Sequence, residues 1–310
     1  MGTTVKRRKM TKGRLVFLLF CIVPPLLHFL IFYIYPNISS FFMAFTNVDS
    51  EISFDNFTRL FKEFADPEVY TQEGSLLEGL KNTAITFGLL VVTFPFKVLV
   101  SYFIYKKVPG SKFFRIVFFL PTIIFSVAMM LIFQQLVSVD SPIAEWVQSS
   151  LGLSYVPDLL ADSDYANTVI LLNLLWIGFP GDLIIWGGTF ARIPEDVLES
   201  GRVDGTTWWT EFTKIIVPMV WPTVALQMVL LTCGFFGASG SVFLLTKGQY
   251  GTMTFAAWQY LELYEYSGSQ YTSNIYNYLS AVGLVTTVIA VAISVTVRKI
   301  ANKAFEEVEF

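Results

Sequence analysis

Six long apolar runs, separated by short polar segments, constrain this chain more than any other feature of its sequence. A membrane-spanning helix needs about 20 predominantly apolar residues, because its backbone groups must be hydrogen-bonded within the segment where water is absent. The charged fraction of only 15% agrees with this class of protein. The runs cover residues 15–35, 83–105, 114–136, 168–190, 219–236 and 278–297. The sequence therefore predicts an all-α integral membrane protein with six transmembrane helices.

The first run follows the basic segment KRRKMTKGR, which is also how a secretory signal peptide begins. The run is longer than the apolar region of a signal peptide, and it ends in FYIYPN without a small-residue cleavage site. We therefore expect a retained membrane anchor at residues 15–35, preceded by a basic N-terminal segment, 1–14.

The distribution of Lys and Arg predicts which side of the membrane each connecting segment occupies, because short cytoplasmic loops carry an excess of these residues. Alternate segments hold most of them: Lys6, Arg7, Arg8, Lys9, Lys12 and Arg14; Lys106, Lys107, Lys112 and Arg115; Arg192, Arg202 and Lys214; and Arg298, Lys299 and Lys303. The opposite segments hold Arg59, Lys62, Lys81 and Lys247. Both ends of the chain, 1–14 and 298–310, are therefore predicted to be cytoplasmic, on either side of a membrane domain, 15–297.

Several classes of enzyme and binding protein are excluded by missing residues. One histidine, His28, and two cysteines, Cys21 and Cys233, are too few for a zinc site, an iron–sulfur site or a disulfide framework. The chain has no Walker phosphate loop, no H-E-x-x-H or G-x-S-x-G motif and no basic-aromatic surface for nucleic acid. We therefore predict no catalytic residue, metal or cofactor in this chain and no nucleic-acid partner.

A transporter without an ATP-binding motif must take its energy from a partner subunit or from an ion gradient. Ion coupling usually leaves ionisable residues within the spans, where a charge costs about 2.5 to 3.5 kcal/mol at the helix centre. Lys97 and Asp182 are the residues of this kind in the predicted spans, which is few for an ion relay. Lys97 is expected to snorkel to the interface or to pair with an acid.

The most polar stretch between the apolar runs is PEDVLESGRVDGTTWWTEFTKIIVP, residues 194–218. A proline and two acids suit the first turn of a helix, and Gly205 ends that helix. Thr206 or Thr207 caps a second helix, which Pro218 stops. The pattern predicts a helix, a turn and a second helix on the cytoplasmic side. Spacing alone leaves open whether this segment is an interfacial linker or a docking element.

The sequence ESGRVDGTTWWTEFTKIIVP resembles the EAA loop of ABC importer permeases, whose pattern is E-A-A, three residues, G, nine residues and I-x-L-P. The residues that match at the required spacing are Glu199, Gly205, Ile215 and Pro218. Ser200 and Gly201 stand where the family usually has alanines, so the helix should be weaker at Gly201. In that family the first short helix is a coupling helix, which sits in a cleft of a cytoplasmic ATPase subunit. The coupling residues implied by the resemblance are Glu195, Glu199, Ser200, Gly201, Asp204, Gly205 and Pro218.

Four further segments narrow the resemblance to the sugar branch, which is similar to the maltose and glycerol-phosphate permeases: LKNTAITF, GSKFFRIVFFLPTIIFS, WIGFPGDLIIWGGTFARIPEDVLESGRVDG and VFLLTKG. The implied partners are a second permease subunit, two cytoplasmic ATPase subunits that hold ATP and Mg, and an extracytoplasmic solute-binding protein. The resemblance favours a different chain over a second copy as the other permease. Residues 37–81 would lie beside the binding protein, whereas SVDSPIAEW, residues 138–146, departs from the family pattern. The implied location is the cytoplasmic membrane of a bacterium or archaeon.

Relatives of the maltose type line a sugar site near the bilayer midplane with the third, fourth and fifth core spans. Carried over by motif, this implies the following path residues: Thr122, Ser126, Gly178, Gly181, Asp182, Phe235, Ala238 and Ser239. Aromatic faces and hydroxyls suit a sugar, and glycines leave room for one. The alternative is that the Thr, Ser and Gly residues are contacts between helices. Asp182 is expected to face the path or the partner permease, with a buried pair or a cap as the alternative.

Taken together, these features predict a transmembrane permease subunit of a binding-protein-dependent ABC importer for an oligosaccharide or related carbohydrate. ATP would close the ATPase subunits, move the coupling helix and turn the cavity outward, and hydrolysis in those subunits would reset it. The coupling loop, 193–218, is part of the permease domain, 15–297. Two alternatives stay open: an ion-coupled secondary transporter, and an ABC permease for a non-sugar solute such as a polyamine or phosphate.

Overall fold

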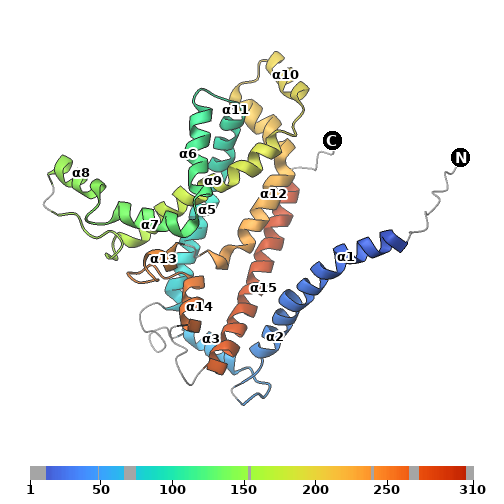
Figure 1. Ribbon diagram of the computed structural model, residues 1–310, viewed down its shortest axis with the longest axis vertical. Helices are drawn as coiled ribbons and strands as arrows, with labels where there is room; N and C mark the ends of the chain where they lie inside the picture. The colour runs from blue at the N-terminus through green and yellow to red at the C-terminus, as the bar shows by residue number, and fades with distance from the viewer. Residues whose placement is uncertain are drawn as a thin grey trace. The chain divides into compact units, whose positions relative to one another are not determined.

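The computed structural model describes residues 12–47, 49–65, 75–152, 155–238, 241–264 and 272–304. The chain divides into two compact units, Met1–Leu60 with Ser269–Leu284 and Phe61–Gly268 with Val285–Phe310. Across the described ranges the regular structure is helical (Figure 1), apart from an isolated antiparallel β-bridge between Thr46 and Ile52. The predicted all-α fold is confirmed.

Six helices in these ranges are long and apolar enough to cross a membrane, as the sequence predicts. They are Lys12–Ala44, Leu76–Tyr105, Ser126–Ser150, Ala166–Phe190, Trp208–Cys233 and Asn274–Ala304, and the third of them consists of two consecutive helices separated by residues 138–141. All but the third cover most or all of a predicted span, and several continue for extra turns beyond it. Hydropathy marks the part of a helix that suits hydrocarbon, whereas the helix itself continues into more polar sequence.

The prediction of one helix over residues 114–136 is wrong. α6 (Ser111–Ile123) and α7 (Ser126–Val137) are separate helices, because Ile124 and Phe125 between them have an extended backbone with ψ of 139° and 132°. The residues around this break are predominantly apolar, with Thr122 and Ser126 as isolated hydroxyl residues. A hydropathy pattern therefore shows one continuous run where the backbone changes direction.

In the first unit, α1 (Lys12–Phe29), the π-helical turn η1 (Leu30–Ile34) and α2 (Tyr35–Ala44) form one long helix. None of the α1 side chains is buried, and such a continuous exposed apolar surface suits lipid contact. Two asparagine side chains join the end of this helix to later parts of the same unit. Asn56 donates to the carbonyl oxygen of Ala44 at 3.1 Å, and Asn277 of α15 (Thr272–Ala304) donates to that of Asn47 at 3.3 Å.

In the second unit, α5 (Leu76–Tyr105) packs along α9 (Ala166–Phe190), and α6 contacts both. The remaining helices of the described ranges are α3 (Asp55–Ala65), α8 (Pro142–Leu151), α10 (Glu195–Val203), α11 (Trp208–Glu211), η2 (Phe212–Ile216), α12 (Val217–Cys233), η3 (Phe235–Gly237), α13 (Val242–Leu245) and α14 (Phe255–Tyr264). A buried cluster that includes Tyr102, Trp186, Phe190 and Ile216 joins the ends of α5 and α9 to the segment that contains α10 and α12. This cluster fixes the predicted coupling loop on the two packed spans.

Pro218 does not stop a helix, contrary to the sequence prediction, because α11, η2 and α12 form one continuous helix, Trp208–Cys233. Proline lacks a backbone N–H, and its ring crowds the preceding turn. The preceding turn is π-helical, with the Val217 N–H donating to the carbonyl oxygen of Phe212. Pro218 directly follows this widened turn, in which an i→i−5 bond replaces the regular i→i−4 pattern beside the proline ring.

Candidate functional site

The segment that resembles an EAA loop forms a helix, a tight turn and a second helix, as predicted. α10 has two acids in its first turn, where they meet the positive end of the helix dipole. It ends in a Schellman motif: the Gly205 N–H donates to the Arg202 carbonyl at 3.1 Å, and the Thr206 N–H donates to the Gly201 carbonyl at 3.0 Å. Gly205 has a φ of +74°, a conformation that favours glycine.

One face of α10 packs against the second helix. Ile193 and Leu198 are buried in the cluster described above, and Gly201 is buried beside them. A Cβ at Gly201 would lie 2.9 Å from Ile215 Cδ1 and 3.3 Å from Thr206 Oγ1. The missing side chain therefore lets the two helices approach closely, which gives Gly201 a packing role.

The opposite face of α10 and the turn after it are exposed and carry several acids. The predicted coupling residues found there are Glu195, Glu199, Ser200, Asp204 and Gly205. Val203, which the sequence analysis did not identify, is 87% exposed in the last turn of α10. We refer to these five residues and Val203 as the coupling face. Pro218, the remaining predicted coupling residue apart from the buried Gly201, is half-buried in α12 and does not belong to this face.

A buried ion pair fixes the second helix of this segment to α5. Lys106 Nζ lies 2.6 Å and 2.9 Å from the two carboxylate oxygens of Glu211, and the Tyr102 hydroxyl donates to Oε1 at 3.1 Å. The Glu211 side chain is 5% exposed and the Lys106 side chain 21%. A carboxylate this buried requires partners, because its desolvation is costly. The coupling loop is therefore attached to the end of α5 by charge as well as by packing.

This pair was not predicted from the sequence, although one residue pattern in the chain indicates that Glu211 needs a partner. Glu211 lies three residues after Trp208 and four before Ile215, which puts it on one helix face with these apolar residues, and an acid on such a face is rarely buried without a partner. Lys106 follows directly after a predicted span. The two residues are 105 positions apart, so the sequence alone does not show that they meet.

A second ion pair lies within the spans, between α5 and α9. Lys97 Nζ is 3.0 Å from Asp182 Oδ2 and 3.0 Å from the Gly178 carbonyl oxygen. The Lys97 side chain is 10% exposed and the Asp182 side chain 34%. Of the two alternatives predicted for Lys97, snorkelling to the interface and pairing with an acid, the structure shows the pair. Of the alternatives for Asp182, the structure shows the pair, and a role in the translocation path stays a prediction.

More polar side chains lie along the same two helices, nearer the beginning of each. Asn82 donates to the carbonyl oxygens of Gly251 and Met253, both at 2.8 Å, and accepts from Asn167 Nδ2 at 3.2 Å. Asn173 is fully buried in α9, and neither atom of its amide has a hydrogen-bond partner among the described residues. Buried amides are normally paired, so Asn173 marks a position that needs a further polar group.

The predicted path residues of the third and fourth spans differ in their surroundings. Ser126 begins α7 and is exposed, and Gly181 in α9 is exposed with open space where a side chain would be. Gly178 and Asp182 are brought together through Lys97. The side chain of Thr122, in the last turn of α6, lies outside the described residues.

Of the path residues predicted near the end of the fifth span, Phe235 packs against other aromatic rings. The ring of Phe235, in η3, packs against those of Phe87 and Phe236, with centroids 4.8 Å and 4.7 Å apart. Ala238 follows η3 and is half-buried. Ser239 lies outside the described residues. Phe235 therefore has a packing contact with α5, and its predicted role in the translocation path stays a prediction.

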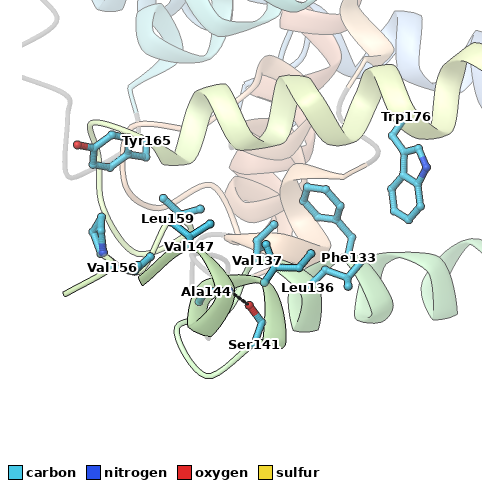
Figure 2. A pocket seen from close by; sticks show the side chains of 12 residues that line it. Phe133, Leu136, Val137, Ser141, Ala144, Val147, Val156, Leu159, Tyr165 and Trp176 are labelled. Carbon is cyan, nitrogen blue, oxygen red and sulfur yellow. Dashed lines mark hydrogen bonds between the residues drawn. The ribbon is translucent and has the colours of Figure 1, made fainter. Parts of the chain in front are cut away.

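An apolar cavity of about 510 Å³ lies between α7, α8 and the beginning of α9. Figure 2 shows Phe133 from α7 and Trp176 from α9 on its lining, and their ring centroids are 5.8 Å apart. Ser141 also lines it, but its hydroxyl accepts from the Ala144 N–H at 3.1 Å as the cap of α8. The cavity contains none of the predicted path residues and offers few hydrogen-bonding groups to a sugar.

Residues 94–307 match the family model of the binding-protein-dependent transport system inner membrane component. The chain belongs to this family. The matched range contains the coupling face and both ion pairs. Family membership favours a membrane component that works with a binding protein over the ion-coupled secondary transporter that the sequence left open.

Several permeases are similar in sequence to this chain, over most of its length or over about half of it. The multiple sugar-binding transport system permease protein MsmF of Streptococcus mutans is 25% identical over 287 residues, covering 92% of this chain and 94% of MsmF. The arabinooligosaccharides transport system permease protein AraP of Bacillus subtilis is 24% identical over 295 residues, covering 90% and 86%. The maltose/maltodextrin transport system permease protein MalF of Vibrio vulnificus is 26% identical over 174 residues, covering 55% and 32%.

Solved structures share the fold of this family member. A chain of a bacterial ABC transporter involved in the import of the acidic polysaccharide alginate has a TM-score of 0.77 at 23% identity, covering 94% of this chain and 96% of that chain. A chain of a bacterial alginate ABC transporter in complex with an alginate pentasaccharide-bound periplasmic protein has a TM-score of 0.78 at 22% identity, covering 95% and 96%. At this identity the likeness shows the fold and not the substrate.

Proposed function

We propose that this protein is a transmembrane permease subunit of an ATP-driven importer for an oligosaccharide or a related carbohydrate. The observation that carries the proposal is the coupling face, an exposed helix surface that a buried ion pair attaches to a membrane-spanning helix. The family requires a binding protein, which fits an importer. The names of MsmF, AraP and MalF refer to sugars or oligosaccharides and support the substrate class.

The energy would come from two cytoplasmic ATPase subunits, because this chain has no Walker loop. Those subunits would hold ATP and Mg and carry the ATPase activity. The coupling face would dock in a cleft of one of them, with the acids Glu195, Glu199 and Asp204 at the contact. The basic connecting segments favour a cytoplasmic location for this face and for both chain ends.

A second permease of a different chain would complete the translocation path. The cavity at α7, α8 and α9 and another of about 530 Å³ between α5, α12 and α15 are both lined almost entirely by apolar side chains. Sugar recognition needs several polar groups that converge on one site. The sugar would therefore bind between two permeases, where Ser126, Gly181 and the exposed part of Asp182 are available, after delivery by the binding protein.

The contacts within this chain supply a route for the movement. A displacement of α10 acts on the second helix through Gly201 and Ile215, and on the end of α5 through Glu211 and Lys106. α5 is joined in turn to α9 by Lys97 and its partners. Closure of the ATPase subunits would move these helices together and turn the path outward, and ATP hydrolysis would reset it.

A neutral oligosaccharide suits the described residues better than an anionic solute. Lys97, the cation within the α5–α9 interface, already pairs with Asp182 and the Gly178 carbonyl. It therefore offers no free charge to a phosphate or a carboxylate. Uptake of phosphate or of a polyamine in place of a sugar would refute the substrate class while keeping the ATP-driven mechanism.

The proposal is tested by reconstituting the assembled transporter in liposomes with its binding protein and labelled maltodextrins or arabino-oligosaccharides. We expect uptake to require ATP on the ATPase side, and we expect Gly205→Val to abolish it. Gly152→Val is the matched control, because Gly152 also has a positive φ, +64°, and open space around it but lies at the end of α8. Uptake that proceeds without ATP and stops with an uncoupler would contradict the proposal.

A further inference from the structure

A small cavity with two cations lies where α5 ends, α6 begins and α9 ends, and the proposed transport mechanism does not use it. Its volume is about 350 Å³, and Lys107 and Arg115 are on its lining. Leu183 supplies part of its apolar wall, and Gly187 and Gly188 of α9 lie on the same side. A Cβ at either glycine would meet no atom within 4 Å, so the two glycines leave this space open.

The charge in this cavity is unbalanced. None of the described residues that line it is acidic. Lys107 and Arg115 are both exposed, and neither forms an ion pair within the ranges that the structure describes. The neighbouring Lys106, in contrast, is engaged by Glu211. Two cations that share one cavity without an acid favour an anionic ligand.

An apolar groove continues from the same cavity along α6. A second cavity of about 440 Å³ shares Arg115 and Phe119 with the first and is otherwise lined by aliphatic residues, Ile116, Leu120, Ile123 and Ile124. From Arg115 to Ile123 the helix rises by about 12 Å. Half of the hydrocarbon core of a bilayer is about 15 Å thick. The groove therefore has the length of one leaflet, with its cationic end at the basic ends of the spans.

We infer that this cavity and groove bind an anionic phospholipid of the surrounding bilayer. The phosphate lies between Lys107 and Arg115, whose guanidinium matches phosphate oxygens in geometry, and an acyl chain lies along α6. Basic pockets between membrane helices recognise anionic head groups in this way. The inference requires only that the chain spans a membrane, so it does not depend on which solute is carried.

The site adjoins the coupling loop on two sides. Lys107 follows the residue that holds Glu211, and α9 leads from Gly187 and Gly188 through Phe190 into α10. A bound lipid therefore attaches the ends of α5 and α9 to the membrane surface at the place where the coupling loop begins.

The test uses the full chain, purified in mild detergent, and counts bound dioleoyl phosphatidylglycerol against dioleoyl phosphatidylcholine by native mass spectrometry. In the double variant Lys107→Gln/Arg115→Gln we expect phosphatidylglycerol affinity to fall about tenfold. The matched control is Lys112→Gln/Lys299→Gln, which removes the same charge from exposed residues that do not line the cavity, and we expect less than a twofold change. An equal loss in both variants would show general surface attraction only and overturn the site.

A second variant, Gly187→Leu/Gly188→Leu, fills the space while keeping every cation and favouring the helix. It is expected to lose phosphatidylglycerol as the charge variant does, and retained binding would overturn the inference even if the charge variant failed to fold. An excess of inorganic phosphate should leave the lipid bound, because the groove holds the acyl chain. Release of the lipid by phosphate would show that the cations bind a free anion instead. If the complex with the partner permease excludes the lipid, the cavity is a subunit contact and the inference fails.

Discussion

The two ion pairs of α5 differ in which partner is buried. At the coupling loop the acid is the more buried member, with Glu211 at 5% exposure and Lys106 at 21%. Within the spans the cation is the more buried member, with Lys97 at 10% and Asp182 at 34%. Removing the partner of the more buried member is the costly change, because the buried charge that remains cannot recover its hydration.

This difference predicts different tasks for the two pairs. The pair at the coupling loop has its charges enclosed, and it holds one helix to another with a tyrosine as a third member. The pair within the spans leaves about a third of the Asp182 side chain accessible, and it uses a backbone carbonyl as a third member. We expect the first pair to determine stability and coupling, and the second to determine passage of the solute.

The largest effect is expected from Lys106→Met, which leaves the Glu211 carboxylate buried with only the Tyr102 hydroxyl. Removing one partner of a buried pair costs about 3–5 kcal/mol. The melting temperature in detergent should fall by roughly 10 °C, at about 2–4 °C per kcal/mol, and ATP-driven uptake should be lost. Lys112→Met, an exposed lysine outside any described ion pair, is the control and should stay close to the native value. An unchanged melting temperature in Lys106→Met would show that the pair contributes nothing to stability.

A smaller loss of stability is expected from Asp182→Asn. Lys97 keeps the Gly178 carbonyl, and the asparagine oxygen can still accept its hydrogen bond, so the cost should be about 1–3 kcal/mol. Uptake should fall more than the stimulation of ATPase activity by loaded binding protein. The measurement is the ratio of solute imported to ATP hydrolysed in liposomes. If this ratio is unchanged while both rates fall together, the pair serves coupling and the contrast with Lys106 and Glu211 is lost.

Reversing the charges sharpens the comparison. In Lys106→Glu/Glu211→Lys the tyrosine hydroxyl can still form a hydrogen bond, because it accepts as well as donates. In Lys97→Asp/Asp182→Lys the Gly178 carbonyl faces a carboxylate and loses its donor. We expect the first reversal to recover most of the stability lost in Lys106→Met, and the second to remain about 1–2 kcal/mol below the native protein. Thermal unfolding of both reversed proteins and of the single variants measures this; equal recovery at the two sites would contradict it.

The partners in both ion pairs could not be identified from the sequence, for a common reason. Hydropathy and charge placement predict the spans because each depends on neighbouring residues. Which cation meets which acid depends on how α5 packs against α9 and against the coupling loop, across separations of 85 and 105 positions. The prediction that Lys97 pairs with an acid followed from the cost of a lone charge, and the identity of the acid required the fold.

Among the local backbone features, one was predicted correctly and two were not. The turn at Gly205 was predicted correctly, because a positive φ is a property of a single residue. The break at Ile124 and Phe125 was missed, because Thr122 and Ser126 are too few polar residues to interrupt the apolar run in which it lies. Pro218 was predicted to stop a helix, and the π-helical turn before it let the helix continue. Backbone adjustments of this kind depend on packing and leave little trace in composition.

The smallest effect is expected from Gly201→Ala, which separates shape from charge at the coupling loop. Alanine favours a helix over glycine by about 1 kcal/mol. Its Cβ would lie 2.9 Å from Ile215 Cδ1, but that atom is the end of a flexible side chain and can shift. The two effects oppose each other, so we expect stability to change by less than about 1 kcal/mol and uptake to persist. Gly201→Leu cannot be accommodated by the same shift, and it should separate α10 from the second helix and uncouple ATP hydrolysis from import while Lys106 and Glu211 stay paired. Normal uptake in the leucine variant would mean that the ion pair alone transmits the movement and that the close contact of the two helices is dispensable.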